Sequence, residues 1–317
     1  MATLNRENYA DLLWVNYTKL IGEGYKKKEK QYDKIFKVLN SDRAYERFLH
    51  MGTLPPWRRN NEGNTFNESE KVEGPEVTIY MHRYDNSFTI THEYWMDNKK
   101  SAMQGRVEGR SGPTELGEGL RKVCEIESAR IINNGFNEVG YDGVPLFSTA
   151  HPLAGSTEVV SNVAPAGETA MTNRNMEIAF AKMGSTQKDE TGYLLQVRPN
   201  KLAVSVDVYF KALRVFHSAQ IAGVNWNDKQ VLPSIQIICM DYFDPGIWVL
   251  QDSSIENLVF YWRERAKFGY EKIQNKMDYK FWGYARFGVG YTDWRGLYAG
   301  KMTEEERNAD TDFVIGG

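Results

Sequence analysis

One continuous helical stripe constrains the fold of this chain more than any other feature of its sequence. Gly112 and Pro113 open it, apolar residues then recur at helical spacing from Leu116 to Ile132, and Gly135 closes it. At 1.5 Å per residue, about 21 residues make a helix roughly 30 Å long. A helix of that length is long enough to cross a domain as its main strut.

The segment before this helix divides at a pair of prolines. Residues 9–49 are mostly helix-forming, and they include a basic stretch at Lys26 to Lys28. A basic stretch of this kind is typical of a solvated helix face, and contact with DNA or a scaffold is the alternative. Pro55 and Pro56, followed by the polar run 60–73, break any helix and mark a boundary.

Residues 76–96 show the alternation that is typical of strands. Apolar residues share one parity from Val77 to Met81, and a second run at 88–95 is rich in aromatic and β-branched residues. Asp85 and Asn86 supply turn chemistry between the runs, so we predict a long hairpin. Because an isolated hairpin is marginally stable in water, it should lie against another subunit or against a sheet of its own chain.

The middle of the chain alternates loops with short elements. Residues 140–172 are rich in Gly, Pro, Ser and Thr without a clear period, which indicates long loops. A helix is expected from Asn173, a plausible N-cap. Strand-like residues follow within 193–206, and a helix is expected at 211–218.

The C-terminal third is expected to be dominated by strands. Two apolar runs at 234–241 and 247–250 flank the Asp-Pro-Gly turn at 244–246, which predicts a second hairpin. Aromatic residues interleaved with glycines follow between 281 and 294. Residues 302–317 are charged and then small, and are expected to form a tail.

The composition argues against several classes of protein. A formal charge of −3 argues against a dedicated nucleic-acid binder. The two cysteines, Cys124 and Cys239, lie in apolar runs and are expected to be buried thiols. The first nine residues are polar, and no stretch approaches the roughly 18 apolar residues of a membrane span. We therefore expect a soluble protein under cytosol-like conditions, with no membrane partner.

No catalytic or metal-binding constellation can be recognised in the sequence. It has no phosphate-binding loop, dinucleotide fingerprint or Cys-x-x-Cys pair. His82 and His92 could face each other across the predicted hairpin, but no carboxylate or cysteine completes a metal site, so a surface pair is expected. His151 lies near Ser148 without a nucleophile elbow and is expected to be a loop histidine. The sequence thus predicts no enzyme, and no catalytic, cofactor-binding or metal residues.

Several segments together resemble the Mu-like major head subunit family of phage capsid proteins. The motif DGVPLFSTAHPL at 142–153 is similar to a segment that is common in that family. Further similar segments follow the family's order along the chain, namely SDRAYERF at 41–48, the run 89–97, the strand and helix at 195–219, IWVLQD at 247–252 and DWRG at 293–296.

This resemblance implies the Hong Kong-type (Hong Kong 97-like) phage capsid fold, an α+β architecture. Its parts would be an N-terminal arm, an extended hairpin loop, a peripheral domain with a long spine helix, and an axial domain. The expected boundaries are 1–54 for the N-terminal arm, 55–108 for the extended loop with its hairpin at about 76–96, 109–139 for the spine helix and part of the peripheral domain, 140–235 for most of the axial domain, and 236–317 for the remaining strands and C-terminal tail.

The resemblance also implies a function, that of a major capsid subunit. Such subunits would self-assemble into pentamers and hexamers of an icosahedral head around double-stranded DNA, as part of a virion assembled in the host bacterial cytoplasm. The expected partners are further copies, a separate scaffolding protein, a portal, and packaged DNA through non-specific contact. The alternatives are the shell of an encapsulin-like nanocompartment, which would hold cargo protein instead of DNA, and a soluble oligomeric enzyme.

Overall fold

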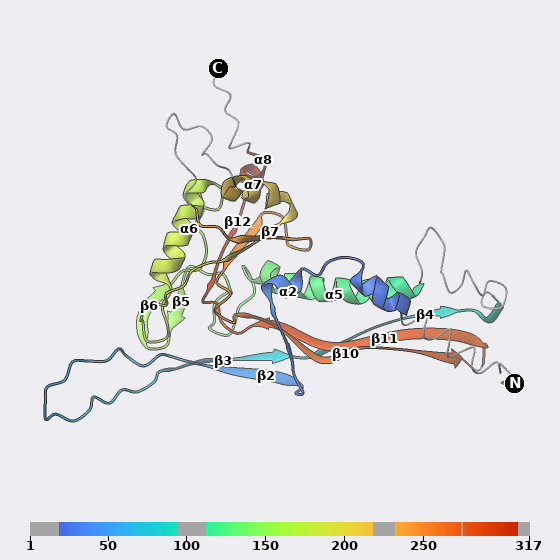
Figure 1. Cartoon of the computed structure of the whole chain (residues 1–317), viewed down its shortest axis with the longest axis horizontal. Helices are drawn as coiled ribbons and strands as arrows, with labels where there is room; N and C mark the ends of the chain where they lie inside the picture. The colour runs from blue at the N-terminus through green and yellow to red at the C-terminus, as the bar shows by residue number, and fades with distance from the viewer. Residues whose placement is uncertain (1–18, 94–111, 218–231, 274, 310–317) are drawn as a thin grey trace, which may run out of the picture.

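The computed structural model describes residues 19–93, 112–217, 232–273 and 275–309. Figure 1 shows a long sheet with one helix along it, a compact lobe standing over one end of that sheet, and a thin two-stranded arm projecting beyond it. We call these three parts the lower lobe, the upper lobe and the arm.

The lower lobe is built on a four-stranded sheet of order β1-β10-β11-β4. The long strands β10 and β11 are antiparallel, β4 is antiparallel to β11, and β1 is parallel to β10. The strands are β1 (Lys37–Asn40), β4 (His82–Ile90), β10 (Leu258–Ile273) and β11 (Asp278–Tyr291). Helices α2 (Tyr32–Ile35) and α5 (Gly112–Asn134) lie along one face of this sheet (Figure 1).

Helix α5 confirms the strut that the sequence predicts. Leu116, Cys124 and Ile132 recur along its buried side. A second, shorter helix at 19–26 crosses it so closely that a Cβ atom at Gly117 would overlap the carbonyl oxygen of Ile21. Glycine is therefore needed at Gly117 because it has no side chain, and this close crossing fixes where the N-terminal segment lies on α5.

The upper lobe has its own sheet, of order β12-β9-β7-β8. Strand β7 runs antiparallel to β9 and parallel to β8, and β12 is antiparallel to β9. Its strands are β7 (Lys201–Ser205), β8 (Gln236–Met240), β9 (Ile247–Gln251) and β12 (Leu297–Lys301), its helices are α6 (Asn173–Thr186), α7 (Val206–His217) and α8 (Glu304–Asn308), and β5 (His151–Leu153) pairs with β6 (Ser156–Val160).

A single buried apolar cluster joins the two lobes. Phe260 and Phe287 stack in the lower sheet with ring centroids 5.0 Å apart, and the same cluster includes Ile132 of α5 and Val249 of the upper sheet. A second cluster around Trp248 fills the space between the upper sheet and its helices. Because apolar burial supplies most of the driving force for folding, the shared cluster makes the lobes one folded unit.

The arm consists of β2 (Tyr45–Met51), β3 (Glu73–Tyr80) and the loop of residues 52–72 between them. Strand β3 crosses the lower sheet at β11, where the chain has Gly288 and Gly290. A Cβ atom at Gly288 would overlap the carbonyl oxygen of Tyr80, so the crossing requires a residue without a side chain.

The predicted hairpin at 76–96 is wrong in its pairing. Both runs form strands, but β3 pairs with β2 and β4 pairs with β11. Asp85 and Asn86 lie inside β4 and form no turn, and the chain changes sheet at Met81. Alternation of apolar and polar residues indicates that one face of a strand is buried. It does not indicate which other strand lies beside it.

The second predicted hairpin also pairs differently. β8 and β9 form as expected, and Gly246 takes the left-handed conformation between them with φ +85. The two strands do not pair, because β7 lies between them and is parallel to β8. Strand β7, which comes earlier in the chain, lies between them, and the residues of the turn give no indication of this.

Several local predictions need smaller corrections. Of the helix-forming stretch 9–49, residues 9–18 lie outside the described part, and the rest is helical only at 19–26 and α2 before β1 and β2 begin. Thr172, not Asn173, caps α6, because its side chain accepts the N–H of Asn175. The loops predicted at 140–172 contain the hairpin β5–β6, and the predicted C-terminal tail contains α8.

The two cysteines differ in their burial. Cys124 is fully buried against the lower sheet, as predicted, and burial raises the pKa of its thiol. Cys239 is only half-buried, which corrects the prediction for that residue. Both thiols are free. Among the helices of the described residues, none is long and apolar enough to cross a membrane.

Candidate assembly surfaces and the joint at the root of the arm

The two faces of the arm have different surroundings. Phe48 and Val77 point to the inner face and pack with Tyr261 of the lower sheet, the rings of Phe48 and Tyr261 being stacked 6.2 Å apart. The outer face carries large apolar side chains that are about half exposed, namely Tyr45, Leu49, Met51 and Tyr80. The exposed ion pair of Arg47 with Glu76 lies among these side chains on the same face. Large exposed apolar side chains that are interspersed with charged groups are typical of a protein contact surface.

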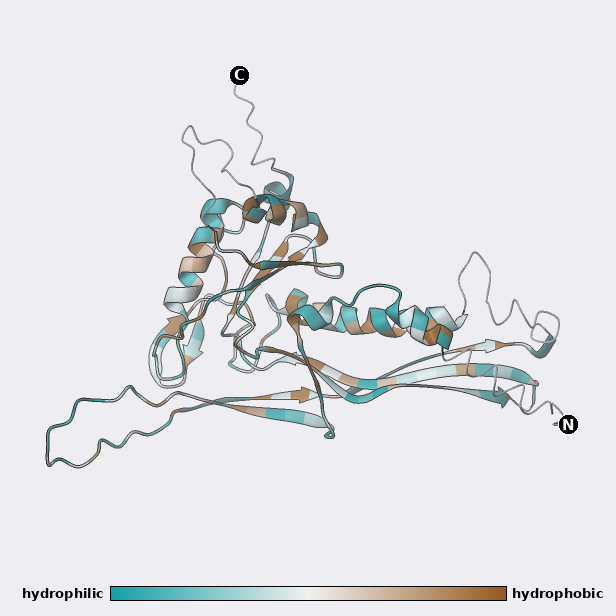
Figure 2. Ribbon diagram, in the orientation of Figure 1, coloured by the Kyte–Doolittle hydropathy of each residue, from teal (hydrophilic) through white to brown (hydrophobic). Residues whose placement is uncertain are grey.

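The loop beyond the strands exposes two further aromatic residues. Trp57 is 103% exposed and Phe66 is 97% exposed, whereas the rest of the loop is largely polar (Figure 2). Aromatic side chains of this size are enriched in interfaces, where they supply large contact areas. The arm therefore offers apolar contact groups along its outer face and at its tip.

The root of the arm is hydrogen-bonded to the upper lobe. The backbone N–H of Thr53 donates to a carboxylate oxygen of Asp189 at 3.1 Å, and its hydroxyl donates to the same oxygen. Thr191 donates to Asp189 through its hydroxyl at 2.8 Å. Burial acts to raise the pKa of Asp189, but these donors outweigh it and lower the pKa below its ordinary value.

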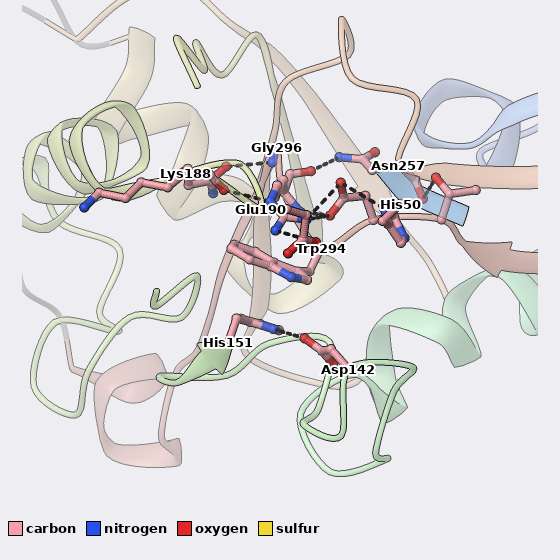
Figure 3. Close-up of polar contacts among 12 residues, drawn as sticks. His50, Asp142, His151, Lys188, Glu190, Asn257, Trp294 and Gly296 are labelled. Atoms are coloured by element: carbon pink, nitrogen blue, oxygen red, sulfur yellow. Dashed lines mark hydrogen bonds and ion pairs between the residues drawn. The ribbon is translucent and has the colours of Figure 1, made fainter. Parts of the chain in front are cut away.

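Glu190, the residue next to Asp189, takes part in a buried ion pair (Figure 3). The guanidinium of Arg295 reaches Glu190 at 2.9 Å and Asp293 at 3.1 Å, and its Nε donates to the carbonyl of Lys188 at 2.7 Å. Arg295 is 3% exposed. Burial acts to lower the pKa of Arg295, but Asp293 and Glu190 outweigh it and raise the pKa.

Glu190 connects three separate segments of the chain. Besides Arg295, its carboxylate accepts the N–H of Ala154 at 2.9 Å, and its backbone carbonyl accepts the N–H of Gly155 at 2.8 Å. Its side chain also packs on Gly74 of β3, where a Cβ atom would come within 2.9 Å of the carboxylate. This joint therefore holds the arm, the β5–β6 hairpin and the upper lobe together.

A second buried carboxylate holds the N-terminal segment on α5. Glu125 accepts the backbone N–H groups of Gln31 at 2.8 Å and Tyr32 at 2.9 Å, which are the first N–H groups of α2. Burial raises the pKa of Glu125 even though these donors act to lower it. Because it satisfies helix-end donors, Glu125 fixes the position of α2 against α5.

His151 has a structural environment. It begins β5 and is fully buried, which corrects the prediction of a loop histidine. Its Nδ1 lies 2.6 Å from Asp142 and its Nε2 lies 3.1 Å from Asn162, and its ring stacks on Trp294 at 4.1 Å (Figure 3). Both ring nitrogens are therefore engaged, and neither is free to act as a base toward Ser148.

His82 and His92 do not come together. His82 lies opposite Phe287 in the lower sheet, and the backbone N–H of His92 donates to Asp278 beyond the other end of β4. The predicted surface pair is therefore wrong, because both residues belong to one strand and its extension. In the part of the chain that the structure describes, no group of three His, Cys, Asp or Glu side chains could hold a metal ion.

The first half of the chain, which includes the arm and α5, matches a known family. A family model described as "Mu-like prophage major head subunit gpT" matches residues 11–171, which is half of the chain. The chain belongs to this family. It is therefore a structural major capsid protein, a component of the phage head, as the sequence motifs predict.

Solved structures show the same fold at low sequence identity. The capsid of the cyanophage P-SCSP1u matches with a TM-score of 0.58 and 11% identity over 87% of this chain and 89% of the other. The mature capsid of bacteriophage PhiM1 matches with a TM-score of 0.54 and 10% identity over 87% of this chain and 88% of the other. A virus-like particle from Pyrococcus furiosus matches with a TM-score of 0.52 and 12% identity over 89% of this chain and 96% of the other. No curated protein sequence matches the chain significantly.

These similarities confirm the predicted Hong Kong 97-like α+β capsid fold for the head subunit. Sequence reasoning missed the joint at the root of the arm. Asp189 and Glu190 belong to no motif, and Arg295 lies in the DWRG segment without a role that the sequence assigns to it. Glu190 and Arg295 are 105 residues apart in the chain. The closely spaced Gly288 and Gly290 of β11 are typical of a close backbone approach, but they lie at the crossing of β3 and not at this joint.

Proposed function

We propose that the head subunit assembles into pentamers and hexamers that close into an icosahedral head around double-stranded DNA. In this proposal, the arm of each copy lies over a neighbouring copy, and α5 gives each copy a rigid axis. The observation that carries it is the arm: one face is packed on its own lobe, and the other presents Tyr45, Leu49, Met51 and Tyr80 to the outside.

The shape of the molecule supports ring formation. The arm projects beyond one end of the lower lobe (Figure 1), and in this proposal the outer face of its strands covers a part of the neighbour other than the neighbour's arm. Contacts between two different surfaces are head-to-tail, and they generate closed rings when the rotation between copies closes. Five-fold and six-fold rings need small differences in that rotation, and the joint at Asp189 and Glu190 is the proposed place of adjustment.

The arm also suggests a new division of the chain. We propose that the extended loop is the arm at 45–80, instead of the expected 55–108, since these residues form the projecting ribbon. The peripheral domain would comprise the lower lobe with α5 as its spine helix. The axial domain would comprise the upper lobe, and β11 would lie in the peripheral domain despite its late position in the sequence.

The partners of the head subunit are also proposed. A separate scaffolding protein and a portal would be needed to build and fill a head in the host cytoplasm. Packaged DNA would be contacted non-specifically, since a formal charge of −3 provides no strong positive field. We propose no catalytic role, because the family is one of structural head subunits. That match also favours a phage head over a cellular compartment as the assembled shell.

The test is assembly itself. Expressed head subunit is examined by size-exclusion chromatography and negative-stain electron microscopy, alone and with the scaffolding protein of its own phage. Closed shells or rings of five and six copies are expected. A monomer or dimer under every condition would contradict the proposal. Nucleic acid rather than cargo protein inside particles from infected cells would distinguish a head from a compartment.

A further inference from the structure

The loop of the arm has two limbs of opposite charge. The outgoing limb, residues 53–60, carries Arg58 and Arg59 and no acidic residue. The returning limb, residues 65–72, carries Glu68 and Glu70 with one basic residue, Lys71. Each limb also has one fully exposed aromatic residue, Trp57 on the outgoing limb and Phe66 on the returning limb.

These groups have no partner within the described residues of their own chain. Arg58, Arg59, Glu68 and Glu70 form none of the ion pairs there. The last backbone rung of the arm is the bond from Gly52 N–H to the Val72 carbonyl at 2.8 Å, and beyond it the limbs separate.

The tip of the loop is nevertheless held in a defined turn. The Asn60 side chain donates to the carbonyl of Thr65 at 2.6 Å and accepts the N–H of Asn61 at 2.9 Å. The backbone N–H of Asn64 donates to the carbonyl of Asn61 at 3.3 Å. Because Asn60 and Thr65 are the ends of the two limbs, this turn keeps the limbs joined as a loop with a basic side and an acidic side.

We infer that this loop binds the same loop of a second copy, with the basic limb of one copy against the acidic limb of the other. The contact would be isologous, since each copy donates both limbs and receives both. It would place Arg58 and Arg59 against Glu68 and Glu70 and would cover Trp57 and Phe66. The inference rests on the proposed self-assembly and names the partner of the arm tip.

The lower lobe offers a less suitable partner for these charges. On the face of its sheet opposite α5, Glu264 already pairs with Lys267 at 2.8 Å and with Arg286 at 3.2 Å. Lys280 pairs with Glu271 at 3.6 Å on the same sheet. A surface whose charges are already paired gains less from a charged loop, whereas two copies of the loop complement each other without further residues.

Charge reversal tests this pairing directly. The variant R58E/R59E makes both limbs acidic, and the variant E68K/E70K makes both limbs basic. Each should fold as wild type does, since the changed residues are exposed, and circular dichroism and thermal unfolding check this. Each variant alone should lose closed particles by electron microscopy, because like charges face each other. An equal mixture of the two should restore them.

The fourfold variant R58E/R59E/E68K/E70K is the matched control. It has the net charge of the wild type and reverses both limbs, so loop-to-loop pairing should be retained and particles should form. If the limbs instead bind a different surface, this variant should fail, and so should the mixture. Either failure would overturn the inference, as would normal particles from both single-limb variants.

Failure of the proposed function can be distinguished from failure of the loop pairing by the behaviour of the wild-type subunit. If wild-type subunits form no rings or shells under any condition, the assembly proposal is wrong. If they do form shells and the charge variants behave against expectation, only the loop pairing is wrong. Rings without closed shells in the single-limb variants would place the loop contact between rings, which supports the inference.

Discussion

Asp189 and Thr53 form the contact that connects the root of the arm to the upper lobe. They lie 136 positions apart in the chain, and the carboxylate of Asp189 accepts both the N–H and the hydroxyl of Thr53. The backbone donor fixes where the loop leaves β2, and the hydroxyl fixes its orientation. The direction of the arm is therefore set by a side chain outside the arm.

Replacing Thr53 by Val should loosen this root without unfolding the subunit. The variant keeps the backbone donor and loses the hydroxyl donor, which costs on the order of 1 kcal/mol. Hydrogen exchange should rise in residues 50–54 and 72–76 and stay unchanged in β10. Thr65→Val at the loop tip is the control, since the structure gives the Thr65 hydroxyl no role there. Equal hydrogen-exchange rates at residues 50–54 and 72–76 in the two variants would show that the Thr53 hydroxyl does not hold the root of the arm.

The same carboxylate predicts a pH dependence. Because the pKa of Asp189 is lowered in the fold, its contribution to stability is present above its unfolded value of about 3.9 and is lost as pH falls through the folded value. Wild type should therefore exceed Asp189→Asn in free energy of unfolding between pH 5 and 7, and the difference should shrink below about pH 4. Urea titrations at each pH measure it, and a difference independent of pH would contradict this origin.

Arg295 should be one of the most sensitive positions in the chain. Truncating it to Ala leaves Glu190 buried beside Asp293 without a cation, and breaking a buried pair in this way costs about 3 to 5 kcal/mol. The matched control is Arg286→Ala, which removes a half-exposed arginine from Glu264 and should change stability little. Denaturant unfolding of both variants provides the comparison, and similar losses would show that burial of the pair is unimportant.

Two glycines on α5 give a paired test of the N-terminal segment. Gly117→Ala should destabilise the subunit and displace residues 19–26, because the new Cβ would overlap the Ile21 carbonyl. Gly119→Ala, two residues away, meets nothing within 4 Å and should stabilise by up to about 1 kcal/mol through helix propensity. Thermal unfolding measures both, and the same sign of change in the two variants would refute the close crossing.

The sequence predicts those elements whose signal is local. Helix α5 could be located from its own periodicity and its flanking Gly112, Pro113 and Gly135, and most strands from alternation or apolar runs. The pairing of the strands could not be predicted. Strand β7 lies between β8 and β9, and β3 and β4 belong to different sheets although they follow each other in the chain. Which strand lies beside another is decided by tertiary packing.

The joint at the root of the arm was beyond sequence reasoning for a related reason. Asp189, Glu190 and Arg295 look like ordinary surface charges until the fold buries them together. Their burial depends on two segments of the chain meeting at one place, and no residue pattern near any of them reports that meeting. The family resemblance gave the fold and the structural role, but it did not identify these residues.

The outer face of the arm should separate assembly from stability at adjacent residues. Leu49 points outward, is half exposed and lies opposite Glu76, so Leu49→Asp should lower the free energy of unfolding by no more than about 1 kcal/mol through repulsion between the two carboxylates. It should nevertheless abolish rings and shells, since a buried interface cannot accommodate an unpaired carboxylate. Phe48 points inward against Tyr261, so Phe48→Ala should lower stability by about 1 to 3 kcal/mol. Unfolding in urea and particle counts by electron microscopy measure the two effects independently. Within the described residues, the outer face packs against no other part of its own subunit. Normal particles from Leu49→Asp would therefore mean that the arm does not cover a neighbour through this face.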